Sequence, residues 1–343
     1  MTSAMIQPFS FPTTVGFVDD SAAFLANLSL QLDSQLAFRF FSSAERALST
    51  INQEESHASM TERFFCRYRD RGEESDAQEV IAMSLDVIWR QVHNERRFEH
   101  TSVVVVDYDM PGLNGLEMCR RIANPAIKKI VLTGKADEHL AVQGFNEGII
   151  DRFIRKQDVG AIPALNQAIG EMQQAYFKQT QHSVVDTLTL STFQFLADPA
   201  FAAKASEIFR TLGIVEHYLW SRPGGLLMLD SAGTPYLLLV FSEEALRATR
   251  EIAVLQDAPA DFLAEFDSHG SVPYFWDSEG YYPSGCLSWQ RYMHPATAIH
   301  GKDTYLYSVI KNPPGLELDP IVSYDDYLER LDQDLHATWG SRP

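Results

Sequence analysis

The run from Val103 to Asp107, followed by the Met-Pro-Gly turn at 110–112, constrains the fold more than any other part of the chain. Four consecutive valines predict a strand covered on both faces, as the strands of parallel sheets are. The Pro-Gly pair predicts a turn soon after the strand. In an open α/β sheet, ligands and chemistry lie at the carboxyl ends of the strands. Asp107 is therefore either a polar strand end or the centre of a site.

Short apolar runs alternate with helical patterns through the first half of the chain. Strands are predicted at Thr13–Asp19, Leu36–Phe41, Val103–Asp107, Ile130–Thr133 and Asp151–Lys156. Helices are predicted at Ser21–Leu32, from about Ala44, at Leu116–Ile122 and around His139–Asn146, and Ser21 fits an N-cap. This alternation indicates βαβ units, and it predicts an α/β domain with a doubly wound parallel sheet, (βα)5.

An insertion at about residues 54–98 separates the second predicted helix from the third strand. Within it, Asp76–Asn94 has apolar residues at 81, 85, 88 and 92, the pattern of an amphipathic helix. Such a helix either covers the domain or forms a partner or dimer surface. After the fifth strand, Val159–His182 is predicted as one helix. Its apolar spacing is that of a coiled-coil seam, although the part before Met172 could instead be the last helix of the sheet domain, packing inward.

The second half of the chain has a different pattern, which predicts an α+β domain. A β-hairpin is expected from Gly225–Asp230 and Pro235–Phe241, and a strand at Thr304–Ile310. One or two helices are expected at Ser191–Leu212, and single helices at Ser242–Leu255 and Ser323–Ala337. The predicted domains are an N-terminal tail (1–11), the sheet domain (12–158), its last helix with a connector (159–183) and the α+β domain (184–343).

Charge and composition narrow the possible partners. The net charge is −18, and after residue 184 acidic residues outnumber basic ones roughly two to one, which argues against DNA binding because that affinity comes mostly from Lys and Arg on phosphates. No apolar run is long enough for a membrane span, and the N-terminus lacks a secretory signal. The three cysteines are far apart and fit no zinc motif or disulfide framework, so a cytoplasmic location is expected.

The predicted strand ends carry a set of polar residues. Asp19 and Asp20 follow the first strand, Asp107 ends the third, Thr133 ends the fourth and Lys156 ends the fifth. Sequential parallel strands would bring these ends to one edge of the sheet. The set resembles the receiver domain of two-component response regulators: an acidic pair, an aspartate before x-x-Met-Pro-x-x-Asn-Gly, Thr with a small residue after it, and a lysine. The resemblance covers residues 12 to about 160.

The resemblance implies a role for each of these residues. Asp107 would be the phosphoacceptor, and Mg²⁺ would be held directly by Asp20 and Asp107, by Asp19 largely through water and by the backbone carbonyl of Asp109. A cation is needed in any case, because clustered carboxylates repel one another, and Mg²⁺ suits carboxylate and water ligands. Thr133 would hydrogen-bond the phosphoryl group and Lys156 would pair with it. Phe153 occupies the place of the aromatic residue that moves with the threonine.

One position departs from the family pattern. The lysine is usually followed by proline with a cis peptide bond, whereas Gln157 follows Lys156 here. A cis bond before a residue other than proline costs roughly 3 kcal/mol, so a trans peptide and a differently shaped loop are expected.

The second domain carries no signature of a known output class. Cys286 lies near His294 and His300 in sequence, which suggests a nucleophile or a metal ligand. A buried or incidental cysteine in an aromatic-rich core is the favoured interpretation. The dense aromatic residues are expected to form that core, with a ligand pocket or interaction groove as the alternative; they are Tyr274, Phe275, Trp276, Tyr281, Tyr282, Trp289 and Tyr292.

The sequence thus predicts a response regulator that is phosphorylated by a histidine kinase or a phosphotransfer protein. Its expected output is a change in protein–protein interaction, with homodimerisation through the last helices of the receiver and the connector. The competing hypothesis, from another class, is a C-terminal enzyme or small-molecule-binding domain that the receiver regulates.

Overall fold

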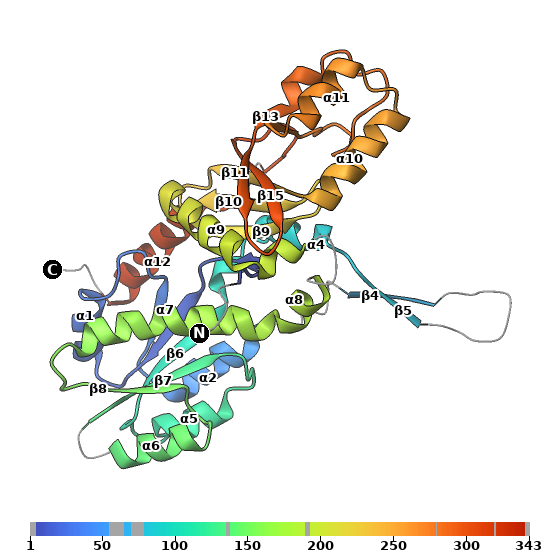
Figure 1. The fold of residues 1–343 in the computed structure, drawn as a ribbon. Coiled ribbons are helices and arrows are strands. Elements are labelled where there is room, and N and C mark those ends of the chain that lie inside the picture. Colours follow the sequence, from blue (N-terminus) through green and yellow to red (C-terminus); the bar gives the residue numbers. More distant parts are fainter. Residues whose placement is uncertain are drawn as a thin grey trace. The chain divides into compact units, whose positions relative to one another are not determined.

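The computed structural model describes residues 5–54, 65–69, 79–134, 138–188, 193–278, 280–318 and 320–339 (Figure 1). The chain forms two compact units. The parallel unit comprises Pro12–Met60, Arg96–Thr180 and Asp326–Pro343, and the antiparallel unit comprises Met1–Phe11, Thr61–Glu95 and Gln181–Asp325. The chain therefore passes from one unit to the other near residues 11, 60, 95, 180 and 325.

The parallel unit is built on a five-stranded sheet of order β3-β2-β6-β7-β8. Its strands are β2 (Thr14–Val18), β3 (Phe38–Phe41), β6 (Thr101–Asp107), β7 (Lys128–Thr133) and β8 (Arg152–Arg155). All neighbouring strands pair in parallel. Every residue of β6 is buried, as its run of valines predicts. The five predicted strands and the doubly wound α/β fold are confirmed.

Helices cover both faces of this sheet. On one face α1 (Ala22–Ser29) and α7 (Ala161–Thr180) close a core that includes Val15, Val103 and Ile130. Helices α2 (Ala44–Gln53), α5 (Gly115–Arg121) and α6 (Glu138–Asn146) belong to the other face. The Ser21 hydroxyl accepts a hydrogen bond from the amide of Phe24, so the predicted N-cap of α1 is confirmed.

The apolar spacing in α7 is explained by packing within the parallel unit (Figure 1). Leu165, Ile169 and Tyr176 are fully buried, and the side-chain amide of Gln173 donates to the carbonyl of Thr13. The helix ends at Thr180, and a separate helix, α8 (His182–Leu188), follows. The prediction of one continuous helix to His182 is therefore wrong, and the inward-packing alternative accounts for the seam.

The last helix, α12 (Tyr324–Trp339), contributes most of its length to the parallel unit. The hydroxyls of Tyr327 and Thr14 lie 2.6 Å apart, and the Tyr327 ring packs against Phe98 with centroids 5.6 Å apart. A terminal helix was predicted here, but it was placed in the C-terminal domain. Its contacts with β2 could not be read from sequence, because the partners lie more than 300 positions away.

The antiparallel unit has a six-stranded sheet of order β1-β9-β10-β11-β15-β14. Its strands are β1 (Phe9–Ser10), β9 (Ile214–Trp220), β10 (Gly225–Asp230), β11 (Pro235–Ser242), β14 (Thr297–His300) and β15 (Thr304–Lys311). The predicted hairpin of β10 and β11 is confirmed, as are β15 and the α+β class. The N-terminal residues 9–10 were predicted as tail but pair with β9.

The antiparallel unit also contains three longer helices and a two-stranded ribbon. The helices are α9 (Pro199–Leu212), α10 (Glu243–Leu255) and α11 (Ala260–Asp267), and the ribbon consists of β12 (Ser271–Pro273) and β13 (Met293–Pro295). The aromatic residues expected to be core are mostly core: Tyr274, Phe275, Tyr282, Trp289 and Tyr292 are buried. Trp276 is half-buried and Tyr281 is exposed, so these two depart from that expectation.

The insertion does not form the predicted helix at Asp76–Asn94. Within its described part, Glu79–Met83 is a strand, β5, paired antiparallel with β4 (Phe65–Arg69). Among the described residues 79–94, only Asp86–Trp89 (α4) and the following 3-10 turn Arg90–His93 are helical, and the predicted positions 76–78 lie outside the described residues. The β-branched pair Val80-Ile81 favours a strand, and helical periodicity cannot reveal a partner strand elsewhere in the chain.

The predicted domains were contiguous in sequence, whereas the compact units are not.

In the described ranges, none of the helices combines the length and the apolar character that crossing a bilayer requires.

Candidate functional site

The parallel pairing brings four strand ends to one edge of the sheet. Asp19 directly follows β2, Asp107 ends β6, Thr133 ends β7 and Lys156 directly follows β8. The pairing register aligns Val18 with Val106 and Asp107 with Leu132, so these ends lie side by side. The sheet thus assembles the set that the sequence predicted at this edge.

Three carboxylates meet there. Asp19, Asp20 and Asp107 each offer an oxygen, and these oxygens all lie within 4.8 Å of one another. Asp19 and Asp107 are buried, whereas Asp20 is exposed. One oxygen of Asp19 also accepts the amide of Ser21 at 2.8 Å, which fixes that side chain. Among the described residues this is the only such group of three or more His, Cys, Asp or Glu side chains.

Lys156 supplies the positive charge within the cluster. Its Nζ lies 2.7 Å from Oδ2 of Asp19 and 2.8 Å from Oδ1 of Asp107. The same ammonium lies 4.3 Å from the ring centroid of Phe24. Burial by itself lowers the pKa of Lys156, but its hydrogen bonds to Asp107 and Asp19 outweigh burial and raise that pKa. Lys156 is therefore held as a cation.

For the pKa of Asp107, burial outweighs the effect of Lys156. Burial raises the pKa of its carboxyl group, and the nearby Asp19 charge raises it further. The hydrogen bond from Lys156 and its charge lower that pKa, but burial prevails. Negative charge on Asp107 is thus costly without a further cation, and the donor set of three carboxylates fits a hard divalent ion such as Mg²⁺.

The turn after β6 needs glycine at position 115. A Cβ there would lie 2.3 Å from the backbone oxygen of Asp107, closer than any real contact. The Gly115 amide donates to the carbonyl of Tyr108, and the side chain of Asn114 caps α5 by accepting the amide of Glu117. The Asn-Gly pair therefore starts α5 directly beside the backbone of Asp107.

The remaining predicted residues lie on β7, on β8 and just after β6. The buried Thr133 hydroxyl donates to the carbonyl of Gly134 at 3.0 Å. The side chain of Asp109 is exposed, and Phe153 is half-buried on β8. The peptide bond between Lys156 and Gln157 is trans, as expected without proline. The contact between Phe24 and Lys156 was not predicted, because Phe24 fits the pattern of an ordinary apolar residue on α1.

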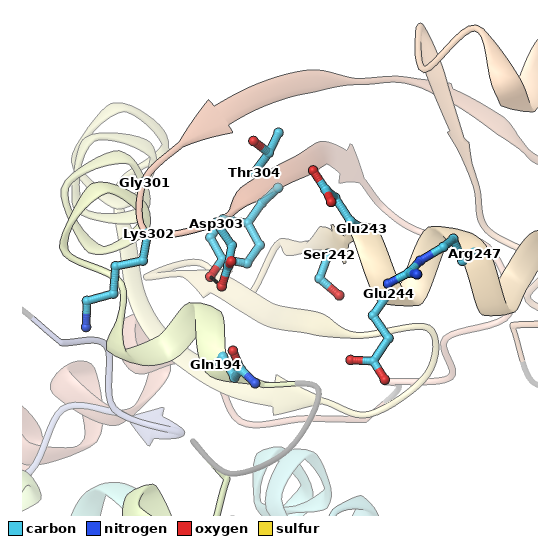
Figure 2. Close-up of a pocket in the computed structure, with 10 residues that line it drawn as sticks. Gln194, Ser242, Glu243, Glu244, Arg247, Gly301, Lys302, Asp303 and Thr304 are labelled. Atoms are coloured by element: carbon cyan, nitrogen blue, oxygen red, sulfur yellow. Dashed lines mark hydrogen bonds between the residues drawn. The ribbon is translucent and has the colours of Figure 1, made fainter.

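The antiparallel unit holds a polar pocket of about 380 Å³ beside the start of α10 (Figure 2). Glu243 and Glu244 lie in the first turn of α10, but Figure 2 shows their side chains pointing away from each other. Asp303 lines the same pocket from the start of β15. These carboxylates do not converge, so the pocket lacks the geometry of a metal site.

The cysteine expectations concern two described thiols. Cys119 is buried, and burial raises the pKa of its thiol to about 12, which keeps it in the unreactive protonated form. Cys286 is half-buried and packs against the aromatic core of the antiparallel unit, as expected for a core cysteine.

Comparisons with known proteins agree with this geometry. A family profile described as the response regulator receiver domain matches residues 74–165. The solved structure of the Legionella pneumophila response regulator LqsR is 35% identical to this chain, with a TM-score of 0.77, and the alignment covers 97% of this chain and 98% of that protein.

Other solved structures match about half of the chain. An adenylate cyclase from Rhodopirellula baltica is 21% identical over 52% of this chain and 99% of that one, with a TM-score of 0.36. A response regulator receiver domain protein from Clostridium thermocellum is 20% identical over 47% of this chain and 94% of its own, with a TM-score of 0.31. Neither carries weight at these scores. A comparison with curated proteins found no match.

Proposed function

The chain belongs to the response regulators, and from that premise we propose that Asp107 is its phosphoacceptor and that Asp19, Asp20 and Asp107 hold Mg²⁺. The observation that supports this most is the Lys156 ammonium placed between the carboxylates of Asp19 and Asp107. Three carboxylates with one internal cation leave negative charge that a divalent ion would neutralise.

The chemical step is nucleophilic transfer onto Asp107. A carboxylate oxygen of Asp107 attacks the phosphorus of a phosphohistidine, the bond from phosphorus to the donor nitrogen breaks, and the electron pair leaves with that nitrogen. Bound Mg²⁺ would supply charge neutralisation for the phosphoryl and carboxylate oxygens. Lys156, already 2.8 Å from Asp107, would keep its ammonium on the acyl phosphate.

Thr133 and Phe153 would carry the change outward. The Thr133 hydroxyl now donates to the carbonyl of Gly134, and it can turn to donate to a phosphoryl oxygen instead. Phe153, on the neighbouring strand, would move with it. Such a switch couples a local change of charge to a wider rearrangement.

The proposal extends to the partners and the output. The phosphodonor would be a histidine kinase or a phosphotransfer protein in the cytoplasm, and the output would be a change in protein–protein contacts, including homodimerisation. The excess of acidic residues in the chain argues against DNA as the target. Light scattering with Mg²⁺ and beryllofluoride should show a shift from monomer to dimer in the wild type, and none in Asp107→Asn.

The direct test is phosphorylation of the full chain by acetyl phosphate. Intact mass should increase by one phosphoryl group with Mg²⁺ and stay unchanged with EDTA or in Asp107→Asn. Asp33→Asn is a matched control, because this exposed carboxylate in the same unit bonds only locally, to the amide of Gln35. Phosphorylation of Asp107→Asn at the wild-type rate would show that another residue is the acceptor.

A further inference from the structure

The antiparallel unit contains a second cavity of about 440 Å³, a size typical of small-molecule sites. Aromatic side chains dominate its lining, and we call it the aromatic pocket: Trp89, Trp220, Tyr274, Phe275 and Trp276. Three of the five tryptophans of the chain thus line one cavity. All three are half-buried, so part of each ring remains accessible.

The polar groups of two of these rings, Trp220 and Tyr274, are hydrogen-bonded within the protein. The indole N–H of Trp220 donates to the carbonyl of Arg222 at 2.6 Å, and the hydroxyl of Tyr274 donates to the carbonyl of Pro314 at 3.3 Å. Burial also raises the pKa of Tyr274 to about 12, which keeps this hydroxyl protonated. Trp220 and Tyr274, like Phe275, therefore offer a ligand mainly their π faces.

Two carboxylates, Asp86 and Glu317, and one guanidinium, that of Arg222, also line the aromatic pocket. The Ser221 hydroxyl donates to Oδ1 of Asp86 at 2.6 Å, which positions this carboxylate through one of its two oxygens. Asp86 and Trp89 are three residues apart on α4, so the charge and the ring lie on the same side of that turn. The formal charge of the lining is negative.

The same rings already attract cations from the protein. The guanidinium carbon of Arg90 lies 5.7 Å from the ring centroid of Trp89, and that of Arg291 lies 5.6 Å from the ring of Trp276. Arg291 is itself paired with Asp277 at 3.5 Å, which offsets its charge. Cation–π geometry is thus in use at two of the three tryptophans.

The wall behind Trp276 is preorganised. Gly315 has φ +75°, and a Cβ at this position would lie 2.8 Å from Cβ of Trp276, so the backbone passes directly beside this side chain. The rings of Trp89 and Trp220 pack against each other, with centroids 5.1 Å apart. A ligand that enters has little side-chain ordering to impose, which favours affinity.

We propose that the aromatic pocket binds a small organic cation, an ammonium group with methyl or other apolar substituents. The π faces of the lining rings suit such a group, tryptophan is the best cation–π partner, and Asp86 and Glu317 complement its charge. A neutral flat molecule would gain from stacking but would leave the two carboxylates unused. This site is independent of the phosphoacceptor and lies within the antiparallel unit.

The test compares choline with its neutral tert-butyl analogue, in which carbon replaces the nitrogen. Both are titrated into the full chain, and binding is followed by tryptophan fluorescence and by calorimetry. Choline should bind about tenfold more tightly than the analogue, because only the cation gains from the rings and carboxylates. Equal affinities, or tighter binding of a neutral flat probe such as caffeine, would overturn the proposal.

Two conservative variants separate charge recognition from folding. Asp86→Asn keeps an acceptor for Ser221, and Glu317→Gln changes an exposed side chain. Each should weaken choline binding about two- to fivefold and leave the neutral analogue unaffected. Glu243→Gln removes the same charge at the other pocket of this unit and should change neither. If all three variants bind choline like the wild type, the carboxylates of the aromatic pocket do not recognise a cation.

Discussion

The acidic edge of the parallel sheet and the aromatic pocket both place carboxylates in a partly buried setting, but they are neutralised differently. At the acidic edge, Lys156 bridges Asp19 and Asp107 from within the protein. In the aromatic pocket, the Asp86 carboxylate accepts a hydrogen bond from the neutral hydroxyl of Ser221. We propose a doubly charged ion and a phosphoryl group as the ligands of the first site, and a single, bulky positive charge as the ligand of the second. If both proposals hold, the neighbours of a carboxylate decide which cation it selects.

The two units should differ in how they respond to the loss of a required glycine, which is the largest effect we expect. A Cβ at Gly225 would lie 1.9 Å from the carbonyl oxygen of Leu238, and one at Gly115 would lie 2.3 Å from that of Asp107. Each change to alanine should cost about 3 kcal/mol in its own unit. Urea unfolding should show Gly225→Ala lowering the fluorescence midpoint more, because Trp89, Trp220 and Trp276 are in the antiparallel unit.

A matched control for these variants is Gly170→Ala. Nothing lies within 4 Å of a Cβ at this position in α7, so alanine should raise the stability of the parallel unit by about 0.5–1 kcal/mol. Equal shifts of the fluorescence and circular dichroism midpoints in both destabilised variants would show that the two units unfold as one, and the comparison between them would fail.

Removal of the internal cation should affect only the acidic edge. Lys156→Met leaves Asp19 and Asp107 without their shared ammonium, so the parallel unit should lose about 1–3 kcal/mol. Added Mg²⁺ should restore part of this loss and should bind more tightly than to the wild type, since it then meets the carboxylates alone. Lys178→Met, at an exposed position on α7, is the control. Calorimetry of Mg²⁺ binding would contradict the assignment if Lys156→Met bound it less tightly.

The pH dependence of stability should reveal the cost of charge on Asp107. Its folded pKa is raised, so its contribution to stability is complete below the ordinary value of 3.8 and is lost as pH rises through the folded pKa. In EDTA at neutral pH, Asp107→Asn should therefore melt higher than the wild type, by about 2–4 °C if the difference is near 1 kcal/mol.

Mg²⁺ should reverse this order, because in the proposed site it would bind the ionised form of Asp107. It should raise the melting temperature of the wild type more than that of Asp107→Asn, and the gap should grow as pH rises through the folded pKa of Asp107. Lys156 has a raised pKa as well, so its stabilising contribution is complete below 10.5 and is lost only at more alkaline pH. A wild type that is more stable than Asp107→Asn in EDTA at neutral pH would contradict the raised pKa.

The acidic edge could be read from the sequence because its residues follow strands in chain order. The valine run predicts β6, parallel pairing then aligns the strand ends, and Asp19, Asp107 and Lys156 need no further information to meet. The lining of the aromatic pocket comes instead from α4, the turn after β9 and two loops. Such non-local proximity has no periodic signal, although the aromatic density around Tyr274 did suggest a core or a pocket.

The same limit explains the errors in organisation. Residues 9–10 pair with β9 some 200 positions later, and Tyr327 reaches back to Thr14. Neither contact leaves a signal in the local sequence. The sequence therefore predicted an N-terminal tail and a contiguous C-terminal domain. An isolated fragment from residue 184 onward would consequently lack β1 and α4, and the full chain is the appropriate material for every experiment.

The smallest effect that still distinguishes the two units is the loss of a helix cap. The Ser21 hydroxyl accepts the amide of Phe24 at the start of α1, and the Ser242 hydroxyl accepts the amide of Ala245 at the start of α10. Either serine changed to alanine should cost about 1 kcal/mol. Only Ser21→Ala should also slow phosphorylation, about twofold, because Phe24 lies under the Lys156 ammonium. Rates measured with acetyl phosphate would contradict this if Ser242→Ala slowed the reaction equally, since that cap belongs to the unit without the acidic edge.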